Sequence, residues 1–256
     1  MAASLSLFAK APILTSRDLA HPPPNVIRTC CAFGVELSIA HIPFARRNDI
    51  TGLDEIGNHV FLGDSDEGNG ILYAQQGGFI DVGHLRDYAD WTAYLYTCIQ
   101  ACQQDGIDTL TLNLGFEGGA KSLVIALSSI GEDVDEYELA GSMAYSLSLW
   151  HEIATWYGAS YVPFIPERYS SFSPEDIYSN LLGVRLGIEA LKSDLEFNDA
   201  MTQLLNKKLI ELGATVTAAQ TTLAFEAVED IWWTREAALP GNQVLLKRYL
   251  DRGDYL

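Results

Sequence analysis

The chain has 256 residues, of which 48% are hydrophobic, and its formal net charge is −18. This apolar content is sufficient for a packed core and argues against a disordered chain. Lys and Arg number only 16, so we do not expect nucleic acid as a partner, because phosphate binding requires clustered cationic side chains. No run of about 18 apolar residues occurs, so no transmembrane segment is expected. Residues 1–14 also lack the basic start of a secretory signal peptide.

The N-terminal third of the sequence predicts an extended segment followed by strands. Residues 1–25 end in three consecutive prolines and are expected to be extended. Residues 26–256 are expected to form a single domain, because no linker composition divides them. Apolar and β-branched runs predict strands within 26–40 and over 71–75. Between these strands, residues 44–70 are polar and rich in glycine, which predicts a long loop of the kind that often carries function.

The rest of the chain is predicted to be mainly helical. The spacing of apolar residues predicts helices over residues 81–104, 133–157, 173–191, 196–212 and 216–236. Residues 109–114 and 122–127 are apolar runs on either side of a glycine-rich turn, which predicts a β-hairpin between the first two helices. This order predicts an α+β fold, a predominantly helical single domain with a small, mainly antiparallel sheet.

A histidine followed directly by a glutamate, His151-Glu152, lies late in the second predicted helix. Zinc hydrolases place a metal ligand next to a general base in this way. Consecutive helical residues are about 100° apart, so both side chains can approach one cavity. The second histidine of the usual His-Glu-x-x-His motif is replaced by Thr155. A metal would therefore need ligands from elsewhere in the chain; the alternative is a helix-terminal histidine beside a surface glutamate.

The first predicted helix contributes a second candidate group. His84 and Asp87 lie three residues apart and therefore share one face of that helix. A histidine with a carboxylate one turn away is typical of a metal ligand and its orienting partner, or of two ligands. Alternatively, Asp81 only caps the helix, while Asp87 and Asp90 pair with Arg86 or with solvent.

The third predicted helix begins with Ser173-Pro174-Glu175, where Ser173 is the expected N-cap. In zinc hydrolases with a glutamate ligand, a carboxylate from the next helix completes the site. Glu175 has this location, although acidic residues also stabilise a helix N-terminus without any further role. His59 in the glycine-rich loop is a weaker candidate for an additional ligand.

The four cysteines are too few for a disulfide scaffold in a chain of this length. They occur as two pairs, Cys30 with Cys31 and Cys98 with Cys102. We expect either buried thiols or a disulfide between the two pairs. A serine hydrolase is not expected, because no Gly-x-Ser-x-Gly element occurs.

Four blocks of the sequence carry distinctive motifs, namely Arg28–Gly34, Gly77–Trp91, Trp150–Gly158 and Phe172–Gly183. These blocks resemble an uncharacterised bacterial family, domain of unknown function 4056. The resemblance covers about residues 22–235 and implies a bacterial origin and a single domain, with no established activity. Members often look like exported or lipid-anchored proteins. No lipobox cysteine occurs near the start of this chain, so periplasmic, envelope-associated and cytoplasmic locations all stay open. The order of elements also looks like the layout of zincin metallopeptidases.

Together these features predict a metal-dependent hydrolase of peptide, amide or ester bonds. His84, His151 and Glu175 are expected to bind a divalent metal, zinc by preference, with one position open for water. Asp87 is expected to orient His84 or to join the ligands, and Glu152 to take a proton from the water. The groups expected to stabilise developing oxyanion charge are Arg86, Tyr178 and Asn180.

Two other functions are open from the sequence, and the substrate could be a small molecule, a peptide or a glycan. A metal-free hydrolase of glycans or cell-wall polymers would use Glu152 with Asp87 or Glu175 as a carboxylate pair. The aromatic loop over residues 157–172 would suit sugar rings. A non-enzymatic binding or structural domain would use the same histidines and acids only to tie helices together by buried hydrogen bonds. A two-iron centre is not expected, because its Glu-x-x-His pair is missing.

Overall fold

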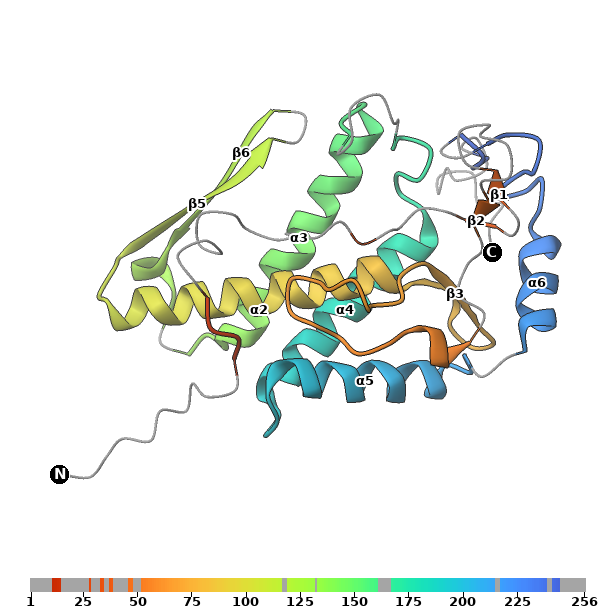
Figure 1. The fold of residues 1–256 in the computed structure, drawn as a ribbon. Helices are drawn as coiled ribbons and strands as arrows, with labels where there is room; N and C mark the ends of the chain where they lie inside the picture. Colours follow the sequence, from red (N-terminus) through yellow and green to blue (C-terminus); the bar gives the residue numbers. More distant parts are fainter. Residues whose placement is uncertain are drawn as a thin grey trace.

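The computed structural model of the protein is mostly helical, with short antiparallel pairs of strands (Figure 1). It describes residues 11–14, 28, 33–34, 37–38, 46–47, 52–116, 119–131, 133–160, 167–214, 217–238 and 241–244. The helices of this part are α2 (Val82–Gln104), α3 (Glu136–Trp156), α4 (Pro174–Lys192), α5 (Phe197–Glu211) and α6 (Ala218–Ala227). Its strands are β1 (Leu37–Ser38), β2 (Arg46–Arg47), β3 (Ile71–Ala74), β4 (Gly78–Asp81), β5 (Thr109–Phe116) and β6 (Ala120–Ala126). The predicted α+β class is confirmed.

Helices α2 to α5 begin and end within a few residues of their predicted bounds, because their start signals are local. Asp81 caps α2 by accepting a hydrogen bond from the backbone N–H of His84. Ser173 caps α4 in the same way, and Pro174 occupies its first turn. Asp135 caps α3. An N-cap hydrogen bond joins a side chain to a backbone N–H only two or three residues later and needs no tertiary contact. The start of such a helix can therefore be predicted from the sequence alone.

The predicted helix over 216–236 is too long, because α6 ends at Ala227. The chain then turns at Asp230, which has a left-handed φ of 60°. This turn brings Trp233 back onto the helix, where it is fully buried and its indole N–H donates to the carbonyl of Phe225 at 2.8 Å. Trp233 also packs near Phe33, which is distant in sequence. Burial of this large side chain outweighs the local preference for continuing the helix.

Among the described residues, the strands form three separate pairs instead of one small sheet, and a zincin-like order of elements is not confirmed. The predicted strand over 71–75 is β3, which pairs with β4. The predicted hairpin is β5 and β6, with Thr109 opposite Ala126. Most of the strand prediction within 26–40 lies outside the described residues, as does most of the predicted extended segment 1–25.

Glycines allow α4 to approach α2 very closely. A methyl group added at Gly183 would lie 2.0 Å from the carbonyl oxygen of Leu85. One added at Gly187 would lie 3.0 Å from the backbone of Ala89. The two contacts advance in the same chain direction, so α2 and α4 run in the same general direction and both begin at the same end of the bundle.

Helix α3 runs in the opposite direction to α4. Near its start, Asp135 contacts Lys192 at the end of α4 at 3.0 Å. Near its end, His151 lies beside His84 in the first turn of α2, with ring centroids 6.0 Å apart. The N-terminal ends of α2 and α4 and the C-terminal end of α3 therefore meet. The partial positive charge of the two N-terminal ends favours carboxylates at this meeting point.

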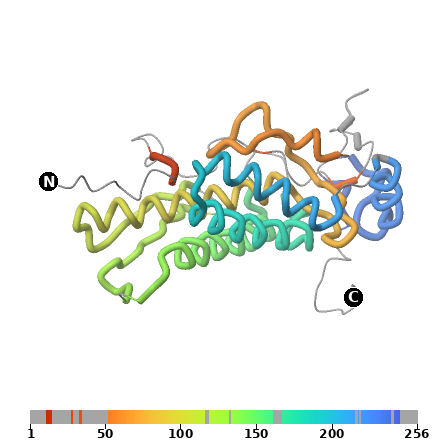
Figure 2. Tube along the Cα trace, turned by 90° about the horizontal axis from the view of Figure 1, so that it is seen from below, coloured from red at the N-terminus to blue at the C-terminus, as the bar shows by residue number. Residues whose placement is uncertain are grey.

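The loop over residues 52–70 and helix α5 cover the side of α2 and α4 that faces away from α3 (Figure 2). Backbone N–H groups of the loop donate to α5 side chains: His59 to Thr202 and Phe61 to Asn198, both at 2.9 Å. In the same view the segment that contains α6 lies at one end of the molecule. Within the described residues, no helix is both long and apolar enough to cross a bilayer.

Candidate metal centre where three helix ends meet

Seven polar side chains gather where the ends of α2, α3 and α4 meet, and we refer to them as the helix-end cluster. They are Asp81, His84, His151, Glu152, Glu175, Asp176 and Asn180. All except the partly exposed His151 are buried, with at most 5% of each residue exposed. Burial of four carboxyl groups in one place is costly unless they bind protons, hydrogen-bond donors or a cation.

Three of these residues form a group that could hold a metal ion. One ligand atom each from Asp81, His84 and Asp176 lies within 4.8 Å of the other two. Asp81 is fixed between the helices, because its carboxylate accepts from the His84 N–H at 2.9 Å and its own N–H donates to Ser179 at 2.8 Å. One imidazole and two carboxylates form a nitrogen and oxygen ligand set that suits zinc, manganese or iron.

Asn180 determines which nitrogen of His84 carries the proton. The Nδ1 atom of His84 lies 3.0 Å from Oδ1 of Asn180. An amide oxygen can only accept, so Nδ1 carries the proton and the lone pair resides on Nε2. We expected Asp87 to orient this ring, but at Nδ1 the partner is Asn180. Metal-binding histidines commonly have such a partner on their other nitrogen.

Glu152 is held by the segment that precedes α4. Its Oε2 accepts a hydrogen bond from the backbone N–H of Phe172 at 2.5 Å. Phe172 has a left-handed φ of 57°, which is strained for a residue that is not glycine. Among the described residues, the other oxygen of Glu152, Oε1, has no hydrogen-bond partner. One carboxylate oxygen is therefore anchored, whereas the other remains available to a ligand.

Thr155, which replaces the second histidine of the zinc motif, has a structural role. Its hydroxyl donates to the backbone carbonyl of His151 at 3.0 Å and accepts from Ser171 at 2.8 Å. These bonds connect the end of α3 to the segment that leads into α4. The residue at this position thus helps to position Glu152 and does not belong to the possible ligand group of Asp81, His84 and Asp176.

Burial controls the protonation of two acids in the helix-end cluster. It raises the pKa of Glu152 above its ordinary value, although the nearby His151 and His84 oppose this effect. Burial also raises the pKa of Asp176 well above its ordinary value, and the neighbouring Glu175 adds to the shift. Burial therefore shifts both acids toward the neutral form, whereas a bound cation would shift them toward the ionised form.

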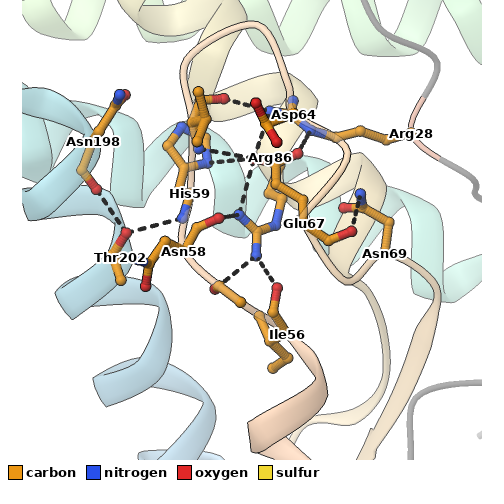
Figure 3. Close-up of polar contacts among 12 residues, drawn as sticks. Arg28, Ile56, Asn58, His59, Asp64, Glu67, Asn69, Arg86, Asn198 and Thr202 are labelled. Atoms are coloured by element: carbon orange, nitrogen blue, oxygen red, sulfur yellow. Dashed lines mark hydrogen bonds and ion pairs between the residues drawn. The ribbon is translucent and has the colours of Figure 1, made fainter.

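Arg86, predicted to stabilise an oxyanion, lies instead in a second buried cluster around the loop over residues 52–70 (Figure 3). Its guanidinium donates to Glu67 at 3.1 Å and to the carbonyl of Ile56 at 2.8 Å. Arg28 binds the same Glu67 through two nitrogens, at 2.7 and 3.1 Å. Glu67 thus joins two arginines, and the two-nitrogen contact is a strong, directional one.

Asp87 also belongs to this second cluster. Its carboxylate accepts from Arg28 at 2.8 Å. Burial raises the pKa of Asp87 to about 6, with Arg28 opposing the shift. Asp90 contacts both Arg28, at 2.8 Å, and His59, at 3.0 Å. These contacts give His59 a partner in this cluster and join the loop to the face of α2 that carries Asp87 and Asp90.

Two other sequence predictions concern Tyr178 and the cysteines. Tyr178 is 37% exposed and acts electrostatically on Lys208 of α5, so the structure does not bring it into the helix-end cluster. Cys98 and Cys102 are buried free thiols, and burial raises the pKa of Cys98 to about 12. A thiol with so high a pKa is a poor nucleophile. The other cysteine pair, residues 30 and 31, lies outside the described residues.

The sequence analysis missed that Asp81 and Asp176 lie beside His84 and that the backbone of Phe172 holds Glu152. Asp81 and Asp176 lie at helix N-termini, where acids are common for reasons of helix stability alone. Their only sequence signal is that each lies within three residues of another candidate, His84 or Glu175. The left-handed backbone of Phe172 has no sequence signal, because an aromatic residue is not typical of that conformation.

The fold and the site together define an α+β protein with a buried cluster of histidines and carboxylates at three helix ends. The chain belongs to the family described as protein of unknown function (DUF4056), whose model matches residues 19–255. This membership confirms the family resemblance of the sequence motifs. No curated protein and no solved structure matches the chain.

Proposed function

We propose that this protein is a metal-dependent hydrolase of peptide, amide or ester bonds. A divalent cation, zinc by preference, is bound by Asp81, His84 and Asp176, and Glu152 is the general base. The observation that carries the proposal is the buried group of one imidazole and two carboxylates next to a further buried glutamate. His151 and Glu175, which we expected as ligands, lie beside this group in the same cluster.

The chemistry of the ligand set supports a bound cation. Catalytic zinc sites use three protein ligands from His, Asp and Glu and leave one position for water. The Nε2 lone pair of His84 and the carboxylates of Asp81 and Asp176 supply such a set. Oδ1 of Asp176 has no hydrogen-bond partner within the described part of the chain. A divalent cation would satisfy this oxygen and offset the repulsion among the buried carboxylates.

A bound cation of this kind lowers the pKa of water and polarises a carbonyl group. Glu152 would accept the proton of the attacking water at Oε1, while the N–H of Phe172 holds Oε2 in place. The raised pKa of Glu152 supports this role, because a general base works best when its pKa is close to the working pH. The Nδ2 group of buried Asn180 has no hydrogen-bond partner among the described residues and would donate to the developing oxyanion.

A metal-free hydrolase is the second candidate, and one observation favours a particular acid pair for it. Glu152 and Glu175 interact electrostatically, whereas Asp87 is bound to Arg28. Glu175 is therefore the better partner of Glu152 in that mechanism. Hydrolysis that persists after treatment with EDTA would select this candidate over the metal-dependent one.

Metal content tests the proposal directly. Protein purified without chelator is measured by inductively coupled plasma mass spectrometry and assayed with chromogenic peptide, amide and ester substrates. Asp176→Asn should bind zinc at least about tenfold more weakly, because it removes a ligand charge. Glu152→Gln should retain zinc but lose at least about 100-fold in rate. The exposed acid Glu138, changed to Gln, is the matched control and should alter neither property. Equal, negligible metal in the wild type and Asp176→Asn would contradict the proposal.

A further inference from the structure

The helix-end cluster contains two sets of side chains with the same chemistry. The first set is His84 with Asp81 and Asp176, whose ligand atoms are mutually within 4.8 Å. The second set consists of the remaining ionisable members, His151, Glu152 and Glu175. Each set has one imidazole and two carboxyl groups, which is a sufficient ligand set for a divalent cation. The first set is the only one in the described part of the chain that meets this distance limit.

The two sets adjoin each other. The rings of His84 and His151 have centroids 6.0 Å apart, and Glu175 and Asp176 are consecutive in the first turn of α4. Glu152 interacts electrostatically with both histidines. Because the two sets share the same helix ends, cations bound to them would be neighbours, as in two-metal sites.

Charge balance favours a second cation. In their ionised forms, the four buried carboxyl groups of the cluster carry four negative charges, of which one divalent ion offsets only two. Glu152 is 2% exposed and Glu175 is 3% exposed, so water screens them poorly. Glu152 Oε1 has no hydrogen-bond partner among the described residues. It is an oxygen that a cation on the second set would satisfy.

We infer that His151, Glu152 and Glu175 bind a second divalent cation next to the first, and that this ion inhibits the enzyme. The inference rests on the proposed function, because it assigns Glu152 as the general base. Coordination would occupy the same Oε1 that accepts the proton from water, so Glu152 cannot be a ligand and a base at once. The second set also needs some side-chain adjustment to converge, so it binds more weakly than the first. Activity should therefore rise with the first equivalent of zinc and fall with the second.

Zinc stoichiometry and manganese spectroscopy test this inference. Metal-free full-length protein is titrated with ZnCl₂ by isothermal calorimetry, and bound zinc is counted after gel filtration. The wild type should bind two ions. His151→Ala and Glu175→Gln should each bind one and should no longer be inhibited by excess zinc. Circular dichroism verifies that each variant is folded, and Glu175→Gln, which is nearly isosteric, suffices if His151→Ala is unstable.

Manganese distinguishes a neighbouring second ion from one bound elsewhere on this acidic protein. Two adjacent Mn²⁺ ions couple magnetically, so the six-line signal at one equivalent should broaden at two. A control variant, Glu138→Gln, should behave as the wild type. One ion in the wild type, or a second ion that is uncoupled and unaffected by Glu175→Gln, would overturn the inference and leave the proposed function intact. Binding of no ion would overturn both.

Discussion

Replacement of Gly183 by alanine tests whether the close contact of α2 and α4 assembles the helix-end cluster. The added methyl group would lie 2.0 Å from the Leu85 carbonyl oxygen, whereas ordinary contacts begin at 3.4 Å. The obstacle is backbone, so α4 must move away from α2 by roughly 1 Å or more. Overpacking of this kind costs about 1–3 kcal/mol, and alanine regains about 1 kcal/mol of helix propensity. Because the 2.0 Å contact is with backbone, the cost lies at the upper end of that range, and we expect a net loss of about 2 kcal/mol in the free energy of unfolding.

Gly187→Ala is the matched control, since it lies one turn later on the same face of α4. Its added methyl group would lie 3.0 Å from the Ala89 backbone, so a smaller shift suffices and the propensity gain offsets the cost to within about 1 kcal/mol. Urea denaturation followed by circular dichroism measures both variants. Gly183→Ala should also bind zinc at least about tenfold more weakly, because it separates ligands on α2 from ligands on α4. The reasoning is refuted if Gly183→Ala is as stable as Gly187→Ala.

Three further predictions concern strain, pH and the second cluster. Phe172→Ala should be less stable than Phe172→Gly by about 1 kcal/mol in urea denaturation, because only glycine adopts a left-handed φ without strain; equal stability would contradict the strain. Burial raises the folded-state pKa of Glu152 and Asp176, so the folded metal-free protein binds more protons than the unfolded chain. These two acids should therefore contribute more to the melting temperature as the pH falls from 7 toward their ordinary pKa values of 4.5 and 3.8. The double variant Glu152→Gln/Asp176→Asn should lose this contribution to the pH dependence, and an unchanged pH dependence would count against the burial argument. Arg86→Met should cost about 3–5 kcal/mol in denaturant unfolding, because it leaves Glu67 buried without one of its cations; a loss below about 1 kcal/mol would show that the contact is weak.

The helices could be predicted from the sequence because their signals are local. Ser173 and Pro174 mark the start of α4, and Asp81 marks the start of α2, without reference to the rest of the molecule. The end of α6 could not be predicted, because it depends on the burial of Trp233 against Phe33, which lies 200 residues away in the chain. Each pair of strands is local in sequence, whereas the joining of such pairs into one sheet depends on tertiary packing that the sequence pattern does not specify.

The candidate site was partly predictable, because the helix ends that carry its residues have local sequence signals. His84, His151 and Glu175 lie near helix ends, and the directions of α2, α3 and α4 bring those ends together. The position of the Arg86 side chain in the second cluster was not predictable, because its carboxylate partner, Glu67, lies in an irregular loop. Arg28 likewise binds Asp87, which also interacts electrostatically with His84.

Gly183 and Gly187 illustrate the limit of such sequence signals. Two glycines four residues apart on a helix face indicate close approach by another backbone, but they do not identify it. The structure identifies α2 as the partner. The contact of Gly183 with Leu85 adjoins His84, and Asp176 of the same helix α4 lies beside that histidine.

Anomalous diffraction from crystals of the untreated protein, recorded above and below the zinc absorption edge, tests the central claim most directly. The account predicts a difference peak about 2.0–2.2 Å from Nε2 of His84 and from carboxylate oxygens of Asp81 and Asp176. The absence of a peak from this position, or a peak bound only by surface carboxylates, would contradict it.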